Sequence, residues 1–296
     1  MITAPSLVSP RRTIGARSFD FDRQVALMGI VNRTPDSFYD KGATFALDRA
    51  VAAARQAAAD GADWVDIGGV PFGTAGPPVS QAEELDRVVP LIAAIRAESD
   101  VVISVDTYRT EVARQAIAAG ADVVNDTSGL YDPELADLVA GTSATLVLTH
   151  SLAQPPRTPV VRPTYGDVVG EIHGFLAGRV KLALARGVPP ERLVIDPGHD
   201  LNKNTHHSLE LTRRLHEIAS LGYPLLAAVS NKDFIGESLN APQGERLHGT
   251  VAALVICILE GARILRVHDV PASRAAIQMT EVILGWRPPA YTRHNL

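Results

Sequence analysis

Ionisable and amide side chains recur directly after short apolar segments of this 296-residue sequence. The residues at such positions are Asn32, Asp106, Asn125, Asp196, Ser230, Asn231, Lys232, Arg266, His268 and Asp269. Any one of them could simply cap a helix or form a turn, as Asp, Asn and Ser often do after a strand. Capping is an insufficient explanation when so many loops carry such groups. Carboxylates and amides match the hydrogen-bonding edge of a heterocycle, and cations match phosphate, so we expect a pocket for a heterocycle with an anionic tail.

The elements that must position these groups alternate between short strands and longer helices. Apolar strands are expected at 25–31, 64–68, 101–105, 122–125, 145–148, 193–195, 225–229 and 264–267. Helices are expected at 47–60, 81–98, 110–119, 133–139, 167–186, 206–221, 247–260 and 272–284. Strands that are apolar almost throughout are typical of parallel sheets covered on both faces. Eight such units predict a single-domain α/β fold, the (β/α)8 TIM barrel, whose working groups stand at the C-terminal strand ends.

Residues 23–287 are expected to form this barrel, with an N-terminal tail at 1–22 and a C-terminal tail at 288–296. Two flavodoxin-like halves are the main alternative. Neither a G-x-G-x-x-G nor a G-x-x-x-x-G-K-[ST] run follows a predicted strand. The sequence therefore indicates neither a dinucleotide-binding site nor a P-loop.

Composition narrows the classes of partner. A net charge of −5 argues against nucleic-acid binding, which usually needs a basic face. The apolar runs are too short to span a membrane, and the N-terminus lacks the apolar core of a secretory signal, so a cytoplasmic protein is expected. The single cysteine, Cys257, cannot form an intramolecular disulfide and is expected to be buried in a helix. Adjacent His206 and His207 do not share a helix face, which disfavours a zinc site.

Seven motifs resemble those of the dihydropteroate synthase family, in the family's order, from Val25 to about Gly285. They are 28–40 (MGIVNRTPDSFYD), 102–107 (VISVDT), 124–129 (VNDTSG), 194–198 (VIDPG), 229–236 (VSNKDFIG), 246–250 (RLHGT) and 266–270 (RVHDV). The family joins 6-hydroxymethyl-7,8-dihydropterin diphosphate to p-aminobenzoate in folate biosynthesis and releases diphosphate. The resemblance implies the TIM barrel and a homodimer formed through the last helices.

The resemblance also implies a pterin site. Its side chains would be Asp106, Asn125, Asp196 and Lys232, with Arg266 stacked on the pterin ring.

A diphosphate site is implied beside the pterin. Asn32 would bind Mg²⁺, and Arg266 and His268 would hold the diphosphate. Mg²⁺ suits such a site because it prefers oxygen ligands and substrate phosphates. The catalytic residues would be Lys232, which also holds the pterin, Arg266 and His268, which with Mg²⁺ stabilise the leaving charge, and Asp36, which stabilises or shields the cation-like methylene.

Several departures from the family pattern lie on the side of the second substrate. The family has a Glu-Ser-Thr-Arg-Pro-Gly type of loop after its second strand, whereas residues 68–78 read GGVPFGTAGPP, without the acid or the arginine. Asn231 replaces an arginine, and Asp200 and Leu201 replace a Gly-Phe pair. A carboxylate at Asp200 would disfavour a nearby diphosphate if it pointed inward. This pattern resembles the divergent second copy of the family in some actinobacteria.

Two classes of function therefore remain open. The first is a dihydropteroate synthase, or a related transferase with another nucleophile. The second is a pterin-binding paralogue with weak or no synthase activity and a regulatory or partner-binding role. A corrinoid-linked methyltransferase on a related barrel is a third hypothesis. A cobalamin-binding domain or partner would distinguish it, and none is recognised in the sequence.

Overall fold

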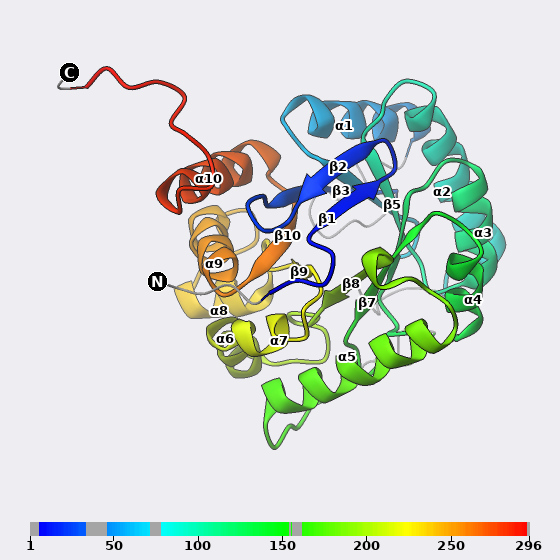
Figure 1. The fold of residues 1–296 in the computed structure, drawn as a ribbon. Coiled ribbons are helices and arrows are strands. Elements are labelled where there is room, and N and C mark those ends of the chain that lie inside the picture. Colours follow the sequence, from blue (N-terminus) through cyan, green and yellow to red (C-terminus); the bar gives the residue numbers. More distant parts are fainter. Residues whose placement is uncertain (1–5, 34–45, 72–77, 154, 156–161, 295–296) are drawn as a thin grey trace.

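The computed structural model describes residues 6–33, 46–71, 78–153, 155 and 162–294. Eight parallel strands close into a barrel in the order β10-β3-β4-β5-β6-β7-β8-β9 (Figure 1), which confirms the predicted (β/α)8 fold. The strands are β3 (Ala26–Asn32), β4 (Trp64–Gly68), β5 (Val102–Asp106), β6 (Val123–Asp126), β7 (Thr145–Thr149), β8 (Leu193–Asp196), β9 (Leu225–Ala227) and β10 (Ala262–Val267).

Helices surround the barrel. They are α1 (Leu47–Ala59), α2 (Gln81–Arg96), α3 (Thr110–Ala118), α4 (Glu134–Ala140), α5 (Val168–Ala185), α6 (Thr205–Arg213), α7 (Leu215–Ala219), α8 (Asp233–Leu239), α9 (Leu247–Leu259) and α10 (Val270–Ile283). Side-chain caps fix where two of these helices begin. Ser80 and Glu83 form a capping box on α2, and Asp269 caps α10.

Two helical segments differ from the expectation. The helix expected at 206–221 is interrupted at Arg214, whose backbone angles are φ −112 and ψ 24. The guanidinium of Arg214 forms ion pairs with Asp167, Glu210 and Glu217, which hold the chain at this break. The short helix α8 was not expected, because its seven residues carry too little periodicity to be recognised. A single 3-10 turn, Pro190–Arg192, leads into β8.

The tail expected at residues 1–22 is instead an ordered hairpin in its second half. Strands β1 (Arg11–Ile14) and β2 (Arg17–Asp20) pair antiparallel and cross the end of the barrel that faces the viewer in Figure 1. Phe19 and Phe21 are buried and stacked, with ring centroids 5.5 Å apart. Two four-residue strands are too short for a clear alternating pattern, so the sequence did not reveal the hairpin.

Two apolar clusters hold the barrel. The larger cluster lies between the strands and the helices. The smaller one fills the barrel interior with side chains that include Met28, Trp64 and Ile264, and joins them to the hairpin phenylalanines. The hairpin therefore closes one end of the barrel, and the polar strand ends lie at the other.

Residues 288–294 contain no helix or strand and are exposed, extending away from α10 (Figure 1). Cys257 is buried in α9. None of the helices that the structure describes is long and apolar enough to cross a membrane.

Candidate functional site

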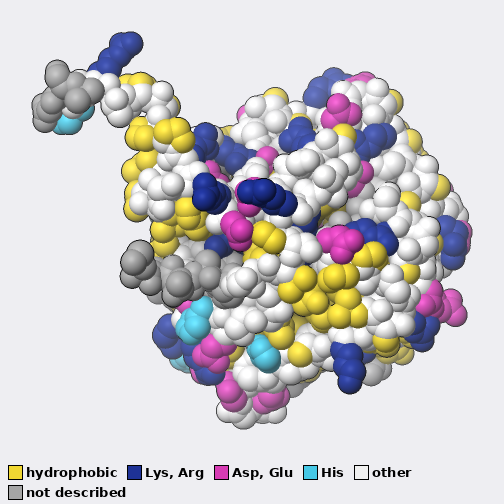
Figure 2. Space-filling view, viewed as in Figure 1, with side chains coloured by type: hydrophobic (Ala, Val, Ile, Leu, Met, Phe, Trp, Pro, Cys, Tyr) yellow, Lys and Arg dark blue, Asp and Glu magenta, His cyan; other side chains and the backbone are white. Residues whose placement is uncertain are grey.

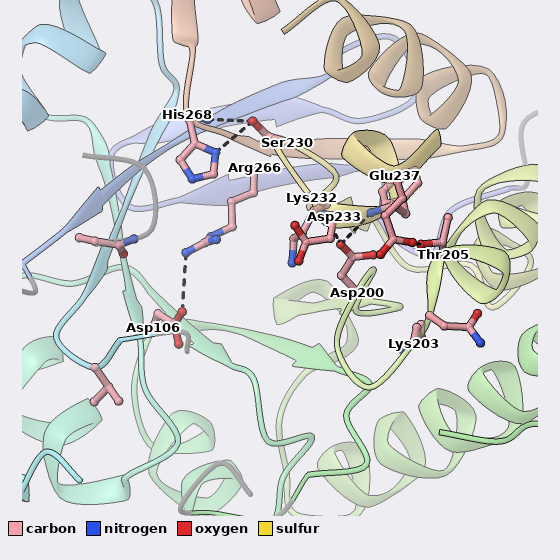
Figure 3. Close-up of a pocket in the computed structure, with 14 residues that line it drawn as sticks. Asp106, Asp200, Lys203, Thr205, Ser230, Lys232, Asp233, Glu237, Arg266 and His268 are labelled. Carbon is pink, nitrogen blue, oxygen red and sulfur yellow. Dashed lines mark hydrogen bonds and ion pairs between the residues drawn. The ribbon is translucent and has the colours of Figure 1, made fainter. Parts of the chain in front are cut away.

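A cavity of about 310 Å³ opens at the C-terminal strand ends. Its walls are formed by Asn32, Val70, Asp106, Asp200, Lys203, Asn204, Thr205, Ser230, Lys232, Asp233, Phe234, Glu237, Arg266 and His268 (Figure 3). Six of the strand-end residues singled out in the sequence line it: Asn32, Asp106, Ser230, Lys232, Arg266 and His268.

Two of the expected pterin-binding residues do not line the cavity. Asn125 and Asp196 are buried at the ends of their strands, 2% and 5% exposed. Asp36, expected to act in catalysis, lies outside the described residues, as does most of the altered second loop.

Strand register brings the polar residues together. Asn32 pairs with Gly68, Gly68 with Asp106, and Asp106 with Asn125, so these positions form one level across β3, β4, β5 and β6. A Cβ atom at Gly68 would lie 2.9 Å from Oδ1 of Asn32, so a larger residue there would displace this side chain. Asn32 can therefore extend its amide over β4.

A buried carboxylate on β4 holds Arg266. The Nε of Arg266 donates to Oδ2 of Asp66 at 2.6 Å, and its Nη2 lies 3.6 Å from Oδ2 of Asp106. Burial lowers the pKa of Arg266, but these two carboxylates outweigh that effect and bring the pKa above its usual value. The guanidinium is thus a permanent cation held on the inner face of the mouth (Figure 3).

Asp66 is the functional candidate that sequence reasoning missed. Its side chain is fully buried and also accepts hydrogen bonds from Ser104 Oγ at 2.6 Å and from Asn125 Nδ2 at 3.3 Å. A carboxylate in the middle of the apolar strand Trp64–Gly68 was the available signal, because a charge inside a parallel strand needs a partner.

The Asn125 amide is only half satisfied. Its Nδ2 donates to Asp66, whereas its buried Oδ1 has no hydrogen-bond partner among the described residues. Buried polar atoms without partners are uncommon in folded proteins and suggest a missing ligand or water. The free acceptor calls for an N–H or O–H donor.

Asp196 lies among cations. Burial raises the pKa of Asp196 to about 6, against the opposing effects of the Gly198 amide, Lys232, Lys203 and Arg266. The ammonium of Lys203 donates to the carbonyls of Gly198 and Leu201, and burial lowers its pKa to about 7. A carboxylate with a pKa near neutrality exchanges its proton easily when a ligand binds.

The last strand places a histidine beside a hydroxyl. The Nδ1 of His268 lies 3.1 Å from Oγ of Ser230, which also accepts the His268 amide at 3.2 Å. This pair fixes the imidazole ring on the cavity wall next to Arg266 (Figure 3).

Comparison with known proteins places this site in a family. Residues 28–268 match the family of pterin binding enzymes. An inactive dihydropteroate synthase 2 from Mycobacterium leprae is 45% identical over 280 residues, 93% of this chain and 96% of that protein. A dihydropteroate synthase from Synechocystis is 41% identical, over 94% of this chain and 96% of that protein. The chain belongs to the dihydropteroate synthase family.

The fold agrees with solved dihydropteroate synthases. The Xanthomonas albilineans enzyme with 4-aminobenzoic acid has a TM-score of 0.85 and 39% identity, covering 94% of this chain and 99% of that chain. The recognition made from the sequence motifs is therefore confirmed, including the similarity to a divergent second copy.

The loop after β9 contains Asn231, one of the expected departures from the family pattern. Asn231, where the resemblance implies an arginine, adopts a left-handed conformation with φ 56, which Asn tolerates better than most residues. The backbone N–H of Asn231 donates to Thr250 Oγ1, and its backbone carbonyl accepts from Arg246. Arg246 also pairs with Asp233 at 2.8 Å. The RLHGT motif thus supports this loop, and Asn231 does not line the cavity.

Asp200, where the resemblance implies a glycine, lines the cavity. Its Oδ2 accepts from the backbone N–H of Asp233 at 2.7 Å, and its Oδ1 accepts from Ser208 Oγ at 2.8 Å. The carboxylate thereby ties the loop after β8 to the start of α8.

Proposed function

We propose that this protein binds 6-hydroxymethyl-7,8-dihydropterin diphosphate in the barrel mouth and condenses it with p-aminobenzoate weakly or not at all. The observation that carries the pterin part is the unpartnered Oδ1 of Asn125, buried next to two carboxylates. A pterin presents ring N–H and amino donors along one edge, which need buried acceptors of this kind. Asp106 and Asp196 would complete the acceptor set, and Lys232 would donate to a ring acceptor.

The cationic wall suits the diphosphate. Arg266 and His268 line the same side of the cavity, and a guanidinium and an imidazole both donate to phosphate oxygens. Arg266 is also planar and can stack on the pterin ring.

Magnesium fits this site if its ligands are an amide oxygen of the protein, phosphate oxygens and water. No cluster of three or more His, Cys, Asp or Glu side chains occurs in the described ranges, so a protein-only metal cage is not available there. Asn32 can supply one amide oxygen, and Mg²⁺ commonly takes its other ligands from phosphate and water. Bound Mg²⁺ would neutralise charge on the diphosphate.

Synthase chemistry would break the bond between the pterin methylene carbon and the diphosphate oxygen, and form a bond from that carbon to the amine nitrogen. Arg266 and His268 would stabilise the negative charge that collects on the leaving group. The nucleophile must be held in line for this step, and orientation supplies a large share of rate enhancement.

Weak or absent turnover is proposed because the groups that would orient the nucleophile have changed. The second loop lacks the acidic residue and the arginine of the family pattern. Asp200 also adds a carboxylate to the wall of the cavity. The Mycobacterium leprae relative is named inactive.

Synthase activity is the second candidate. The Synechocystis relative, named a dihydropteroate synthase, is only slightly less similar to this chain. Most of the expected pterin and diphosphate groups meet at the mouth, so an amine that reached the methylene would find a leaving group already stabilised.

One calorimetric titration tests the proposal. The dihydropterin diphosphate with Mg²⁺ is expected to bind with micromolar or tighter affinity, to lose at least tenfold in Asp196→Ala, and to be unchanged in the surface control Asp137→Ala. A discontinuous assay for dihydropteroate then separates the two candidates. Absence of binding at millimolar ligand would refute the pterin site, and turnover comparable with a synthase would refute the inactive form.

We also propose a homodimer formed through α9 and α10. Exposed apolar side chains occur on both helices: Ile256, Met279 and Ile283 are 45%, 57% and 72% exposed. Hydrophobic side chains are visible along this edge of the molecule in Figure 2. Contiguous exposed apolar surface is typical of an interface between proteins.

A further inference from the structure

Asp200 occupies the start of α8 with its own carboxylate. Oδ2 accepts from the backbone N–H groups of Asp233 at 2.7 Å and Phe234 at 3.4 Å, and Oδ1 accepts from Ser208 Oγ at 2.8 Å. Its backbone is in the left-handed region, with φ 61. A group that accepts from three donors and donates to none is used as a carboxylate.

The charge of Asp200 is not offset by these partners, which are two amides and a hydroxyl. Of the other two acids on this wall, Asp233 has its charge offset by an ion pair with Arg246, and Glu237 accepts a hydrogen bond from the hydroxyl of Thr205. The carboxylates of Asp200 and Glu237 therefore make the end of the cavity formed by α6 and α8 negatively charged.

The cations of the cavity form their hydrogen bonds with other groups, although Lys203 also interacts with the charge of Asp200. Arg266 and His268 lie on the opposite side from Asp200 and Glu237 (Figure 3). Lys203 points its ammonium at His150 Nδ1 and two backbone carbonyls, and its pKa of about 7 leaves it only partly charged at neutral pH. Lys232 donates to the His199 carbonyl.

We propose that Asp200 sets the charge of the second ligand that this cavity admits beside the pterin. It selects against an arylamine that carries a carboxylate and in favour of one that is uncharged or cationic at its outer end. The carboxylate of an incoming ligand would be repelled by the Asp200 carboxylate. It could not accept from the first N–H groups of α8, because these already donate to Asp200. This inference rests on the proposed function, because it assumes that the pterin fills the side of Arg266.

The sharpest variant is Asp200→Asn. Asparagine tolerates a positive φ and keeps one oxygen to accept from the α8 amides, so the substitution removes the charge with little other change. Ser208→Ala is the matched control, because it removes a hydrogen bond of the same carboxylate and leaves the charge in place. Thermal unfolding establishes that both variants are folded.

The probes are p-aminobenzoate and its uncharged analogue 4-aminobenzamide. Each is titrated calorimetrically into protein saturated with 6-hydroxymethyl-7,8-dihydropterin and inorganic diphosphate. In the native protein the amide is expected to bind about tenfold more tightly than the acid, the effect of one like charge in a partly hydrated mouth. Asp200→Asn should tighten p-aminobenzoate about tenfold and change the amide less than twofold, whereas Ser208→Ala should keep the native ratio.

Other outcomes decide against the inference. It is overturned if the native protein prefers p-aminobenzoate, if Asp200→Asn leaves the ratio unchanged, or if neither amine binds to either protein. Binding of the pterin is measured first and separately. If the pterin does not bind, the proposed function fails, and the change in p-aminobenzoate affinity from native protein to Asp200→Asn, measured on the unliganded protein, still tests the role of Asp200.

Discussion

Arg266 donates from Nε to Oδ2 of Asp66 at 2.6 Å, although 200 residues separate the two in the chain. The strands that carry them, β10 and β4, both flank β3, so the bond crosses the interior of the barrel. Asp66 is fully buried and the Arg266 side chain is 17% exposed. Such a pair is held in place chiefly because breaking it would leave a buried charge without a partner.

Asp66→Asn is therefore expected to weaken pterin binding at least tenfold. It should also lower the free energy of unfolding by about 2–4 kcal/mol, since the Arg266 charge loses its buried partner. Calorimetry and urea unfolding measure the two effects. Asp63→Asn removes the partner of Arg274 on the outer side of the barrel, so it should cost stability without changing the dissociation constant. Equal binding by Asp66→Asn and native protein would contradict a positioning role.

Pterin affinity should fall as the pH drops below 6. The pKa of Asp196 is raised to about 6, so the carboxylate takes up a proton as the pH falls through that value. A ligand that donates to the ionised carboxylate must displace this proton, which weakens binding by up to about tenfold per pH unit. Lys232, Lys203 and Arg266 face the same group and favour its ionised form.

The titration uses 6-hydroxymethyl-7,8-dihydropterin without diphosphate, so that phosphate protonation does not contribute. Asp196→Asn should bind weakly and with a much smaller dependence on pH between 5 and 8. A native dissociation constant that is constant over this range would rule out Asp196 as the acceptor.

His199→Leu should stabilise the protein by about 1–2 kcal/mol, because a buried polar group without a hydrogen bond is costly. The His199 ring is fully buried, and neither ring nitrogen has a partner among the residues described. Urea unfolding at pH 7.5 measures the difference, with exposed His206→Leu as the control. A destabilised His199→Leu would indicate that the ring nitrogens have partners in solution.

The same variant should change the dependence of stability on pH. Burial, assisted by Lys203 and Lys232, lowers the pKa of His199 to about 3. The folded protein keeps this histidine neutral while the unfolded chain protonates it below about 6.5, so stability is lost as the pH falls from 6.5 toward 3. His199→Leu should therefore lose less stability than native protein between pH 7 and 5.

Phe21→Ala tests whether the hairpin closes the barrel. The side chain is fully buried against the inner cluster, so its removal should lower the free energy of unfolding by about 3–5 kcal/mol. Arg11→Ala on the same hairpin is 85% exposed in its side chain and should change stability by less than about 0.5 kcal/mol. Equal unfolding midpoints for the two variants would show that the hairpin contributes little.

The proposed homodimer predicts that Ile283→Glu, alone or with Met279→Glu, yields a monomer. A buried unpaired charge at an apolar interface is unfavourable enough to dissociate it. Sedimentation velocity of native and variant proteins measures the change. Leu184→Glu, at an exposed apolar position on α5, should leave the oligomeric state unaltered. A native protein that sediments as a monomer would refute the dimer.

The barrel was predictable from local patterns alone. Buried parallel strands need apolar residues throughout, and this requirement marks each strand even when it is only four or five residues long. The strand Trp64–Gly68 was predicted with the bounds that the structure shows, and the polar residues Asn32, Asp106 and Arg266 were expected at one mouth because parallel strands end together. Seven motifs in order then indicated the family.

Only the tertiary structure revealed how these groups are held. The partner of Arg266, the pairing of Asp200 with α8 and the hairpin beneath the barrel all join segments that are distant along the chain or too short to show a pattern. Asp200 illustrates the difference most clearly. Its sequence position indicated an extra negative charge near the mouth, but the carboxylate is oriented by the first backbone N–H groups of α8, 33 and 34 residues further along the chain.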